Sequence, residues 1–426
     1  MTERAVADDG PLTEISVALE AFAKGEILVV VDDEDRENEG DLIMAAEHVT
    51  PEKIAFFLHH TSGFICAPIT SERASELDLR PMVDQNTESM RTAFLVSVDA
   101  RHGTTTGISA YDRAATIALL ADPKTRPDGL ISPGHVFPII ARDGGVLVRA
   151  GHTEAAVDLA RMAGCAPAGV ICEILDAAGN RATPEQLVEL AVQHHLRIIS
   201  IEQLIAHRRV SEKLVSRATQ AQLPTRYGHF TVIVYDVKYE AQQPVVLVMG
   251  DPAAHPAPLV RLHSSCFTGD LVASLRCDCR DQLEVALKRI AEEEYGMVLY
   301  LRQEGRGIGL LNKLRAYGLQ DRGLDTVEAN LALGFRDDER EYSIAAHMLH
   351  SLGVKSIRLL TNNPKKVAEL EKYGVVVSGR LPHVIPPNEF NRFYLETKRD
   401  RSGHYLDAIG KPHLPEQGED VQVATD

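Results

Sequence analysis

Strand-like and helix-like segments alternate along this chain in two series, and a polar stretch rich in charge and glutamine, residues 201–226, separates them. In the first series the apolar run 27–31 predicts a buried strand. A chain of 426 residues is also longer than one hydrophobic core usually organises. We therefore expect a mixed α/β (α+β) protein with two independent αβ domains, residues 1–207 and 208–426, joined by a short charged helical linker.

The clearest element boundaries come from turn and capping residues. Thr50 followed by Pro51 is typical of a helix start, and Gly63 closes that helix. Thr183 and Gln186 form a capping box at the start of another helix, which ends near residue 195. The apolar periodicity predicts further strands at 169–175, 230–235, 297–301 and 356–361, and further helices at 282–294, 310–319 and 342–352.

The composition is that of a folded globular protein, with 44% hydrophobic and 25% charged residues. No apolar run approaches the roughly 20 residues that cross a bilayer, and the N-terminus lacks a basic region followed by an apolar stretch. We therefore expect a cytoplasmic protein without a membrane partner, and a disordered tail after Gly410. The net charge of −16 argues against a protein that coats nucleic acid, so an anionic ligand must meet local positive charge.

Three of the six cysteines are clustered in the spacing C-x10-C-x-C, at Cys266, Cys277 and Cys279. In a cytosolic chain such a cluster is more typical of metal ligands than of disulfides. Small buried thiols are the alternative, but Arg276 and Arg280 make the setting polar, which suits core packing poorly. Three thiolates leave the fourth tetrahedral position of a zinc ion open, as in catalytic zinc sites.

A glycine-rich segment, Gln303-Glu-Gly-Arg-Gly-Ile-Gly309, lies between the predicted strand 297–301 and the predicted helix 310–319. Glycines at such a junction let backbone N–H groups approach an anion at the helix N-terminus. A plain strand-to-helix turn is the alternative. The sequence contains no GxxxxGK[ST] motif, so a nucleotide bound here would not be held by a Walker loop.

The second half carries these features within a longer series of motifs. In order they are Arg261-Leu-His-Ser-Ser-Cys-Phe-Thr-Gly-Asp270, Arg276-Cys-Asp-Cys279, Gln282, Leu301-Arg-Gln-Glu-Gly-Arg-Gly-Ile-Gly309, Ala316-Tyr-Gly-Leu-Gln-Asp321, Asp325-Thr326, Asp337-Asp-Glu-Arg340 and Leu360-Thr-Asn-Asn-Pro-Lys-Lys366. The series resembles GTP cyclohydrolase II over residues 226–403. The resemblance implies zinc at the three cysteines and GTP contacts at Arg261, Gln282, Glu304, Gly305, Arg306, Thr326, Thr361 and Lys366.

The same resemblance implies reacting groups. It makes Asp338 the proton acceptor, Tyr317 an active-site side chain and Arg340 a nucleophile toward the α-phosphate. A guanidinium with a pKa above about 12 is a poor nucleophile and a good clamp for phosphate charge, so we list Arg340 as catalytic and leave its role open. The reaction opens the imidazole ring of guanine and releases formate and pyrophosphate, chemistry that an activated water, a carboxylate and a phenol can serve.

In the first half, residues 32–41 hold seven acids and one arginine between two apolar segments. A solvated loop is the usual interpretation of such a charge run, but apolar flanks on both sides draw this one toward the core edge. A bound divalent cation would offset the negative charge. Hard oxygen donors favour Mg²⁺ or Mn²⁺, which we therefore expect in this half.

The motif Arg149-Ala-Gly-His-Thr-Glu-Ala155 opens a helix where arginine, hydroxyl and backbone N–H groups can hold a phosphate. Together with the acidic loop and residues 103–109, 133–135 and 171–173, it resembles 3,4-dihydroxy-2-butanone 4-phosphate synthase over residues 13–207. That family converts D-ribulose 5-phosphate and releases formate. The resemblance implies metal at Glu37 and His152, substrate contacts at Arg36, Glu37, Asp41, Thr106, Arg149, His152 and Thr153, and catalytic roles for His135 and Glu173.

Two positions depart from these family patterns. Ser132 stands where the synthases usually have arginine, and Ser265 stands where the cyclohydrolases typically carry glutamate. Cys66 also matches the synthase pattern, but a buried structural thiol is the preferred interpretation. The change at Ser265 leaves three alternatives for the second half: an inactive domain, a GTP sensor, or an enzyme that stops at a formylated ring-opened product. We expect a bifunctional enzyme of riboflavin biosynthesis that forms a homodimer, as both families usually do.

Overall fold

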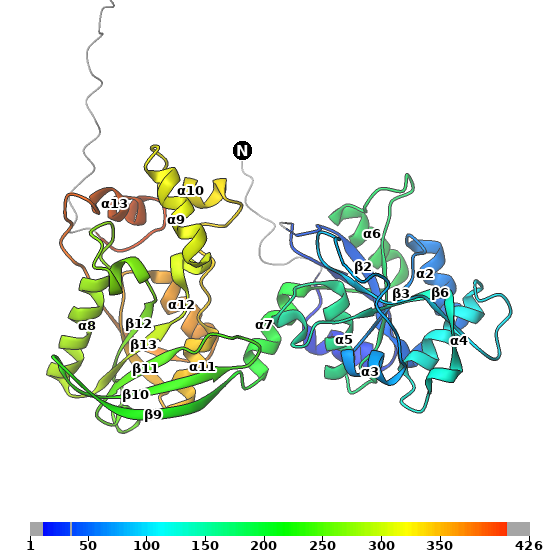
Figure 1. Ribbon diagram of the computed structural model, residues 1–426, viewed down its shortest axis with the longest axis horizontal. Helices are drawn as coiled ribbons and strands as arrows, with labels where there is room; N and C mark the ends of the chain where they lie inside the picture. The colour runs from blue at the N-terminus through cyan, green and yellow to red at the C-terminus, as the bar shows by residue number, and fades with distance from the viewer. Residues whose placement is uncertain (1–11, 35, 407–426) are drawn as a thin grey trace, which may run out of the picture. The chain divides into compact units, whose positions relative to one another are not determined.

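The computed structural model describes residues 12–34 and 36–406, so the tail predicted after Gly410 lies outside the described residues. The chain divides into two compact units, Met1–Glu212 and Lys213–Asp426. Each unit is built on one mixed β-sheet with helices packed against it, which confirms the predicted mixed α/β class (Figure 1). Among the described helices, none combines the length and the apolar character that a membrane span requires.

The first unit has an eight-stranded sheet with the strand order β4-β6-β3-β7-β2-β1-β8, to which β5 is added beside β6. The strands are β1 Leu28–Val31, β2 Gly40–Ala45, β3 Cys66–Ile69, β4 Ala93–Phe94, β5 Val98–Ala100, β6 Leu130–Ile140, β7 Gly169–Glu173 and β8 Arg197–Ser200. The helices are α1 Ile15–Ala23, α2 Pro51–His60, α3 Ser71–Glu76, α4 Ala110–Ala121, α5 His152–Met162, α6 Pro184–His194 and α7 Ile201–Ser211.

Strand β2 shows how this sheet is covered on both faces. Leu42 and Met44 point into the core that contains α2 and α4, whereas Ile43 and Ala45 point into the core that contains α1 and α5. All four residues are buried. Because successive side chains of a strand alternate between faces, β2 can be apolar throughout and still satisfy the sheet.

The second unit has a seven-stranded sheet with the order β15-β14-β12-β13-β11-β10-β9. The strands are β9 Val215–Thr225, β10 Gly228–Val237, β11 Val245–Met249, β12 Leu259–Ser264, β13 Gly296–Leu301, β14 Ser356–Leu360 and β15 Val376–Leu381. The helices are α8 Cys279–Glu293, α9 Gly309–Gln320, α10 Thr326–Ala332, α11 Ser343–Ser351, α12 Pro364–Lys372 and α13 Arg392–Asp400. The predicted strands and helices of this half are all present within a few residues of their expected bounds.

The residues around the domain boundary form parts of the two units rather than a separate helical linker. Helix α7 is present, but Leu204 is fully buried in the core of the first unit. The following residues form β9, which pairs along its length with β10 in the second unit. Cross-strand hydrogen bonding therefore determines the conformation of 215–225, a stretch for which the sequence predicted no strand.

Four strands of the second sheet run parallel, in the order β13, β12, β14 and β15. Their carboxyl ends consequently meet at one edge of the sheet. Residues Ser265, Glu304 and Thr361 follow these ends directly or within a few positions. The crevice outside the carboxyl ends of parallel strands is where open α/β sheets bind ligands.

Candidate active sites

The acidic loop of the first unit is the turn between the antiparallel strands β1 and β2. Four carboxylates of residues 32–41 gather around His152, the first residue of α5. Ligand atoms of Asp32, Glu37 and His152 lie within 4.8 Å of one another, and so do those of Glu39, Asp41 and His152. The structure therefore brings together the two expected metal ligands, Glu37 and His152, and surrounds them with further carboxylates.

The protonation of these groups fits a divalent cation. His152 Nε2 lies 3.0 Å from the carbonyl oxygen of Val30, and burial lowers the pKa of His152 to about 4. A neutral ring that donates from Nε2 keeps the lone pair of Nδ1 for a metal. Burial and the neighbouring Glu173 raise the pKa of Asp41 well above its usual value, and Asp41 Oδ1 has no hydrogen-bond partner among the described residues. A cation such as Mg²⁺ or Mn²⁺ would satisfy that oxygen.

A cradle of positive charge lies beside this cluster, at the N-terminus of α5. A Cβ atom at Gly151 would lie 2.3 Å from Arg149 Nη1 and 3.1 Å from Arg36 Nη2, so both guanidinium groups reach the same glycine. Arg149 also pairs with Glu154 at 2.7 Å, and Thr153 is buried in the first helical turn. Two arginines, a hydroxyl and a helix N-terminus are suited to a phosphate group.

His135 lies on β6 and is held by Asp99 of β5. Asp99 accepts a 2.9 Å hydrogen bond from the backbone N–H of His135, and its second oxygen lies 2.7 Å from His135 Nδ1. The loop that carries the exposed Thr106 passes close by, because a Cβ at Gly107 would lie 2.6 Å from His135 Nδ1. The carboxylate fixes the ring so that Nε2 is the nitrogen available for proton transfer.

Glu173 lies at the end of β7, directly opposite Asp41 of β2. Its carboxylate accepts a 3.0 Å hydrogen bond from Ser62 Oγ. Because Glu173 lies opposite Asp41, this expected catalytic residue is part of the same carboxylate cluster. Cys66 lies below it in the core, and burial followed by the charge of Glu173 raises the pKa of this thiol. These features are those of a structural thiol. Ser132, where the synthases usually have arginine, is exposed to solvent.

In the second unit the three cysteines converge between the end of β12 and the start of α8. Their Sγ atoms lie within 4.8 Å of one another, with 3.7 Å between Cys266 and Cys277. Thiolates bound at about 2.3 Å to one tetrahedral ion are about 3.8 Å apart. Gly269 leaves the necessary space, because a Cβ there would lie 2.8 Å from Cys277 Sγ. The donor set and its spacing fit zinc.

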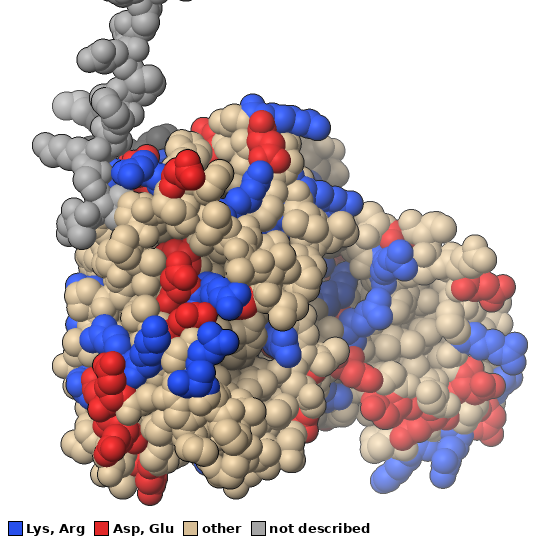
Figure 2. All heavy atoms as spheres, turned by 60° about the vertical axis from the view of Figure 1, so that its left-hand side comes forward, with Lys and Arg blue, Asp and Glu red and all other residues tan. Residues whose placement is uncertain are grey.

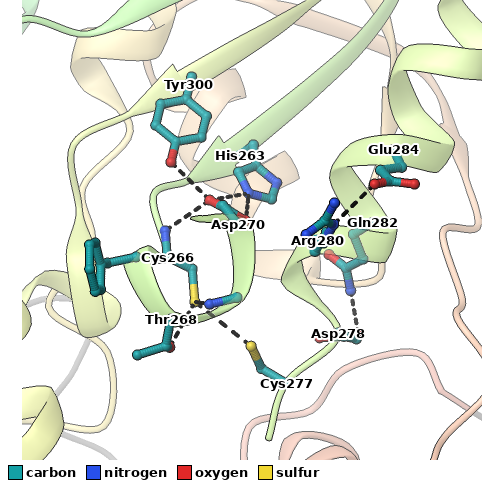
Figure 3. A network of polar contacts seen from close by, with 12 residues as sticks. His263, Cys266, Thr268, Asp270, Cys277, Asp278, Arg280, Gln282, Glu284 and Tyr300 are labelled. Atoms are coloured by element: carbon teal, nitrogen blue, oxygen red, sulfur yellow. Dashed lines mark hydrogen bonds and ion pairs between the residues drawn. The ribbon is translucent and has the colours of Figure 1, made fainter. Parts of the chain in front are cut away.

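A buried carboxylate organises the loop between the first and second cysteines (Figure 3). Asp270 Oδ2 accepts hydrogen bonds from the backbone N–H of Cys266 at 3.0 Å and from Tyr300 Oη at 2.9 Å. His263 Nε2 lies 3.0 Å from Asp270 Oδ1, and its ring stacks on that of Tyr300. Asp270 therefore joins strands β12 and β13 to the turn that carries Cys266.

Helix α9 adds a lysine and a phenol to the thiolates. Lys313 Nζ lies 3.0 Å from Cys266 Sγ and 2.6 Å from Glu304 Oε1. The other oxygen of Glu304 accepts a 2.6 Å hydrogen bond from the N–H of Phe267. Tyr317 Oη lies 3.3 Å from Thr268 Oγ1, and burial raises its pKa to about 12. The phenol therefore keeps its proton at neutral pH and can donate it.

The glycine-rich segment forms the turn expected between β13 and α9, and its backbone adopts an unusual conformation. Gly305 and Arg306 both have positive φ, 65° and 63°. A non-glycine residue rarely adopts this conformation, and such residues are concentrated at functional sites. Arg306 Nη1 lies 2.5 Å from Asp337 Oδ1, so the turn is tied to the loop that precedes Asp338.

Most of the residues expected to contact GTP line two cavities, and Arg340 lines both. The thiolate cavity is lined among others by Ser265, Cys266, Cys277, Cys279, Gly305, Arg306, Lys313, Tyr317, Thr326 and Arg340. The cationic cavity is lined among others by Arg261, Asp278, Gln282, Arg340, Thr361, Lys366 and Lys398. Glu304 and Asp338 line neither cavity and contact them through their partners, Lys313 and Arg340.

Comparison with known proteins identifies both halves. Residues 16–207 match the family model of 3,4-dihydroxy-2-butanone 4-phosphate synthase, and residues 216–382 match that of GTP cyclohydrolase II. Riboflavin biosynthesis protein RibBA from Bacillus subtilis (strain 168) is 52% identical over 393 residues, which cover 92% of this chain and 98% of that protein. The chain belongs to the RibBA family. It is a bifunctional enzyme of riboflavin biosynthesis, as its sequence predicted.

A solved structure supports the two-domain fold. RibBX, a two-domain 3,4-dihydroxy-2-butanone 4-phosphate synthase from A. baumannii, is 33% identical, covers 88% of this chain and 100% of its own, and superposes with a TM-score of 0.66. A 3,4-dihydroxy-2-butanone 4-phosphate synthase in complex with two magnesium ions is 47% identical and covers 47% of this chain and 98% of its own, with a TM-score of 0.46. The comparisons favour the bifunctional RibBA interpretation over an inactive or GTP-sensing second half.

In the cyclohydrolase half, Arg340 and Asp338 form a two-point ion pair. Arg340 Nε lies 2.7 Å from Asp338 Oδ1, and Nη2 lies 2.5 Å from Oδ2. Burial opposes the charge of Arg340, but Tyr342 and Asp338 raise its pKa above the ordinary value. Burial likewise opposes the charge of Asp338, but Arg340 holds its pKa at about 2. A guanidinium that keeps its proton so firmly favours the clamp over the nucleophile.

Several residues of these two sites were not singled out from the RibBA sequence. Lys313 lies one helical turn before Tyr317, and that spacing could have revealed it. Asp270 stands within the cysteine motif, but nothing local indicates which groups its carboxylate binds. Asp99 and Lys398 reach their partners His135 and Asp278 only through tertiary contacts.

Proposed function

We propose that the synthase half acts on D-ribulose 5-phosphate at the carboxylate cluster around His152, with Mg²⁺ or Mn²⁺ held by Glu37 and His152. The observation that carries this proposal is the meeting of two carboxylate sets at one neutral, buried imidazole. The phosphate of the substrate would lie in the cradle formed by Arg36, Arg149 and Thr153. A bound divalent ion supplies positive charge beside the substrate oxygens and neutralises the surplus of carboxylates.

The proton transfers of this reaction fall to the chain's own acids and bases. Glu173 lies beside Asp41 on the neighbouring strand, where a carboxylate can take a proton from a sugar carbon or hydroxyl. His135 is oriented by Asp99, so its Nε2 can return a proton during the carbon migration that precedes formate release. Asp41 and Arg36 would position the hydroxyl groups of the sugar.

In the cyclohydrolase half we propose that the guanine of GTP lies in the thiolate cavity and its phosphates in the cationic cavity. Arg340 lines both cavities, which suits a side chain that contacts the α-phosphate between them. Zinc at the three cysteines would supply a Lewis acid for the hydrolytic steps. Tyr317 donates a proton from its neutral phenol, and Asp338 accepts one once phosphate competes for Arg340.

Positive charge for GTP is local in this acidic chain. On the face that Figure 2 brings forward, lysine and arginine side chains alternate with aspartate and glutamate, with both signs close together. The cationic cavity departs from that mixture, since Arg261, Arg340, Lys366 and Lys398 meet there around one carboxylate, Asp278. GTP is therefore attracted to a particular cavity although the net charge is −16.

Product analysis tests both parts of this proposal. The purified protein, loaded with zinc and Mg²⁺, is incubated with GTP or with ribulose 5-phosphate, and the products are identified by mass. We expect 2,5-diamino-6-ribosylamino-4(3H)-pyrimidinone 5′-phosphate, formate and pyrophosphate from GTP, and 3,4-dihydroxy-2-butanone 4-phosphate and formate from the sugar. A formylated ring-opened product, or GTP bound but unchanged, would contradict the proposal for the second half.

The homodimer and the cytoplasmic location expected from the sequence also belong to this proposal. The six cysteines are all free, which agrees with a reducing compartment. Light scattering on the eluting protein tests the dimer, since a mass of 46.7 kDa would mean a monomer. Fractionation of the source cells tests the location.

A further inference from the structure

The last described segment of the chain, residues 392–406, forms part of the cationic cavity. It begins with α13 and lies beyond residues 216–382, which match the cyclohydrolase family model (Figure 1). Four of its side chains nevertheless line the cavity, namely Leu395, Lys398, His404 and Leu406. None of these four was expected to take part in the reaction.

The charges in this cavity are not balanced. Four basic side chains line it, from Arg261, Arg340, Lys366 and Lys398. Asp278 pairs with Lys398 and Asp338 pairs with Arg340, so two carboxylates face four basic groups. Burial, followed by repulsion from Arg261 and Arg340, lowers the pKa of Lys366 well below its ordinary value. Cations gathered in this way destabilise one another unless an anion lies between them.

Polar nitrogens in the same cavity also lack partners. The donors Arg261 Nε and Asn363 Nδ2 are buried, as is His404 Nδ1, which donates in the tautomer that protonates it, and none of the three has a hydrogen-bond partner among the described residues. A buried donor without an acceptor costs about 1–3 kcal/mol. The donors come from β12, from the start of α12 and from the segment after α13, so they face a shared space rather than one local turn. A ligand with many acceptor oxygens would satisfy all of them.

Lys398 is well placed to bind such a ligand. Its Nζ lies 3.3 Å from Asp278 Oδ1 and 4.2 Å from the ring centre of Tyr394. Asp278 also accepts a hydrogen bond from Gln282, an expected GTP contact, so Lys398 belongs to the same polar network. An ammonium group has three N–H donors, and contact with one carboxylate oxygen leaves capacity for another acceptor.

We propose that Lys398 and His404 bind the phosphate groups of GTP, so that residues 392–406 belong to the substrate site. This inference rests on the proposed function of the second unit and deepens it. The competing explanation is structural: Lys398 would serve only to neutralise Asp278, which lies between the zinc ligands Cys277 and Cys279.

Binding of inorganic tripolyphosphate distinguishes the two explanations, because this probe carries the phosphates of GTP without guanine. We expect the zinc-loaded parent to bind it in a calorimeter. Lys398→Met should weaken tripolyphosphate binding and raise KM for GTP by at least about tenfold, the usual effect of losing a hydrogen bond to a charged group. Zinc content and guanosine binding should be unchanged. Arg392→Met, on the exposed side of the same helix, is the matched control and should bind like the parent.

A second variant covers the case in which Lys398→Met disturbs the zinc loop. Asp278→Asn combined with Lys398→Met removes both charges of the pair, so no buried charge is left without a partner. We expect this double variant to keep its zinc and still bind tripolyphosphate weakly. Parental tripolyphosphate affinity in either variant would overturn the inference, whatever the zinc content. If the parent itself fails to hydrolyse GTP, the proposed function is wrong; if it hydrolyses GTP and only the tripolyphosphate result fails, this inference alone is wrong.

Discussion

The candidate sites of the two units carry surplus charge of opposite sign. In the synthase half, carboxylates from a turn between antiparallel strands outnumber the arginine among them, and Arg36 pairs with both Asp32 and Glu37. In the cyclohydrolase half, basic side chains from the ends of parallel strands and from α13 outnumber the two carboxylates that pair with them, Asp278 and Asp338. The first site lacks positive charge and the second lacks negative charge.

This contrast shows what each site must acquire in order to work. The first requires a hard cation before a phosphorylated sugar can approach its carboxylates, whereas the second is ready for a polyanion. The candidate metal donors differ in the same way, oxygen and imidazole in one unit and thiolate in the other, so we expect each site to select its own metal. Because the sites lie in separate units, changes at one should leave the other active.

The strongest test of this independence is a reciprocal pair of variants. Glu37→Ala should abolish formate release from ribulose 5-phosphate by removing a metal ligand, and should leave GTP hydrolysis within about threefold, since distant sites behave additively. Asp338→Ala should do the reverse. Formate and pyrophosphate release measured on the same preparations check both effects. Glu34→Ala, an exposed acid of the same loop, should retain the synthase activity. Joint loss of both activities would mean that the halves share a site or a folding unit.

The difference in metal donors can be tested through zinc. Cys277→Ser should lose both the metal and GTP turnover while the synthase half keeps its fold and activity, because serine is a poor ligand for this ion. Metal analysis after dialysis gives the zinc content, which should be one per chain in the parent. Cys165→Ser, which changes a cysteine far from the cluster in sequence, should keep its zinc. GTP turnover by a zinc-free enzyme, or zinc retained in Cys277→Ser, would rule out the assignment.

A smaller effect is expected at the carboxylate that supports the thiolates. Asp270→Asn should weaken zinc binding by about 10- to 100-fold, the usual consequence of removing a group that orients a metal ligand. The amide cannot accept from Cys266, Tyr300 and His263 as the carboxylate does. Competition with a chromogenic chelator measures the affinity, and exposed Asp281→Asn serves as the control. Unchanged zinc affinity in Asp270→Asn would show that the network has another purpose.

A gain rather than a loss of function is expected at Ser265, which lines the thiolate cavity where related cyclohydrolases typically carry glutamate. Ser265→Glu should raise kcat/KM for GTP by at least about tenfold, because a hydrogen bond to a charged group is worth about 1.5–3 kcal/mol. Repulsion between the new carboxylate and GTP opposes this gain, but solvent and mobile ions screen it to about 1 kcal/mol or less. Steady-state rates and product masses check the outcome. The hypothesis fails if the variant is no faster and makes the same product.

Local sequence signals predicted the elements that carry these sites. The glycines of residues 303–309 indicated a turn between a strand and a helix, and Gly305 does adopt positive φ there. Thr183 and Gln186 form the predicted capping box. The segment after α7 could not be assigned in the same way, because pairing with β10 determines its strand conformation. Signals carried by neighbouring residues can be recognised in the sequence, whereas pairing between strands cannot.

The site residues differ in the same way: those close together in the sequence could be predicted as partners, and those from distant segments could not. Short spacing and a polar setting predicted that Cys266, Cys277 and Cys279 share an ion, and their Sγ atoms do lie within 4.8 Å of one another. Lys398 lies 120 positions from Asp278 in the sequence, and no local pattern connects them. Asp99 and His135 are likewise joined only by the folded sheet. Partners that come from distant segments require the tertiary structure.

The range of residues that line the cationic cavity has a consequence for biosynthesis of the enzyme. Arg261 is its first contributor in the chain and Leu406 its last, so the cavity cannot be complete until nearly the whole chain has left the ribosome. The synthase half contributes all its described site residues by Glu173. Since domains fold in the order in which they are made, each nascent chain should gain the sugar-phosphate activity before the GTP activity. A ribosome stalled between the two units would carry the first of the enzyme's two activities without the second.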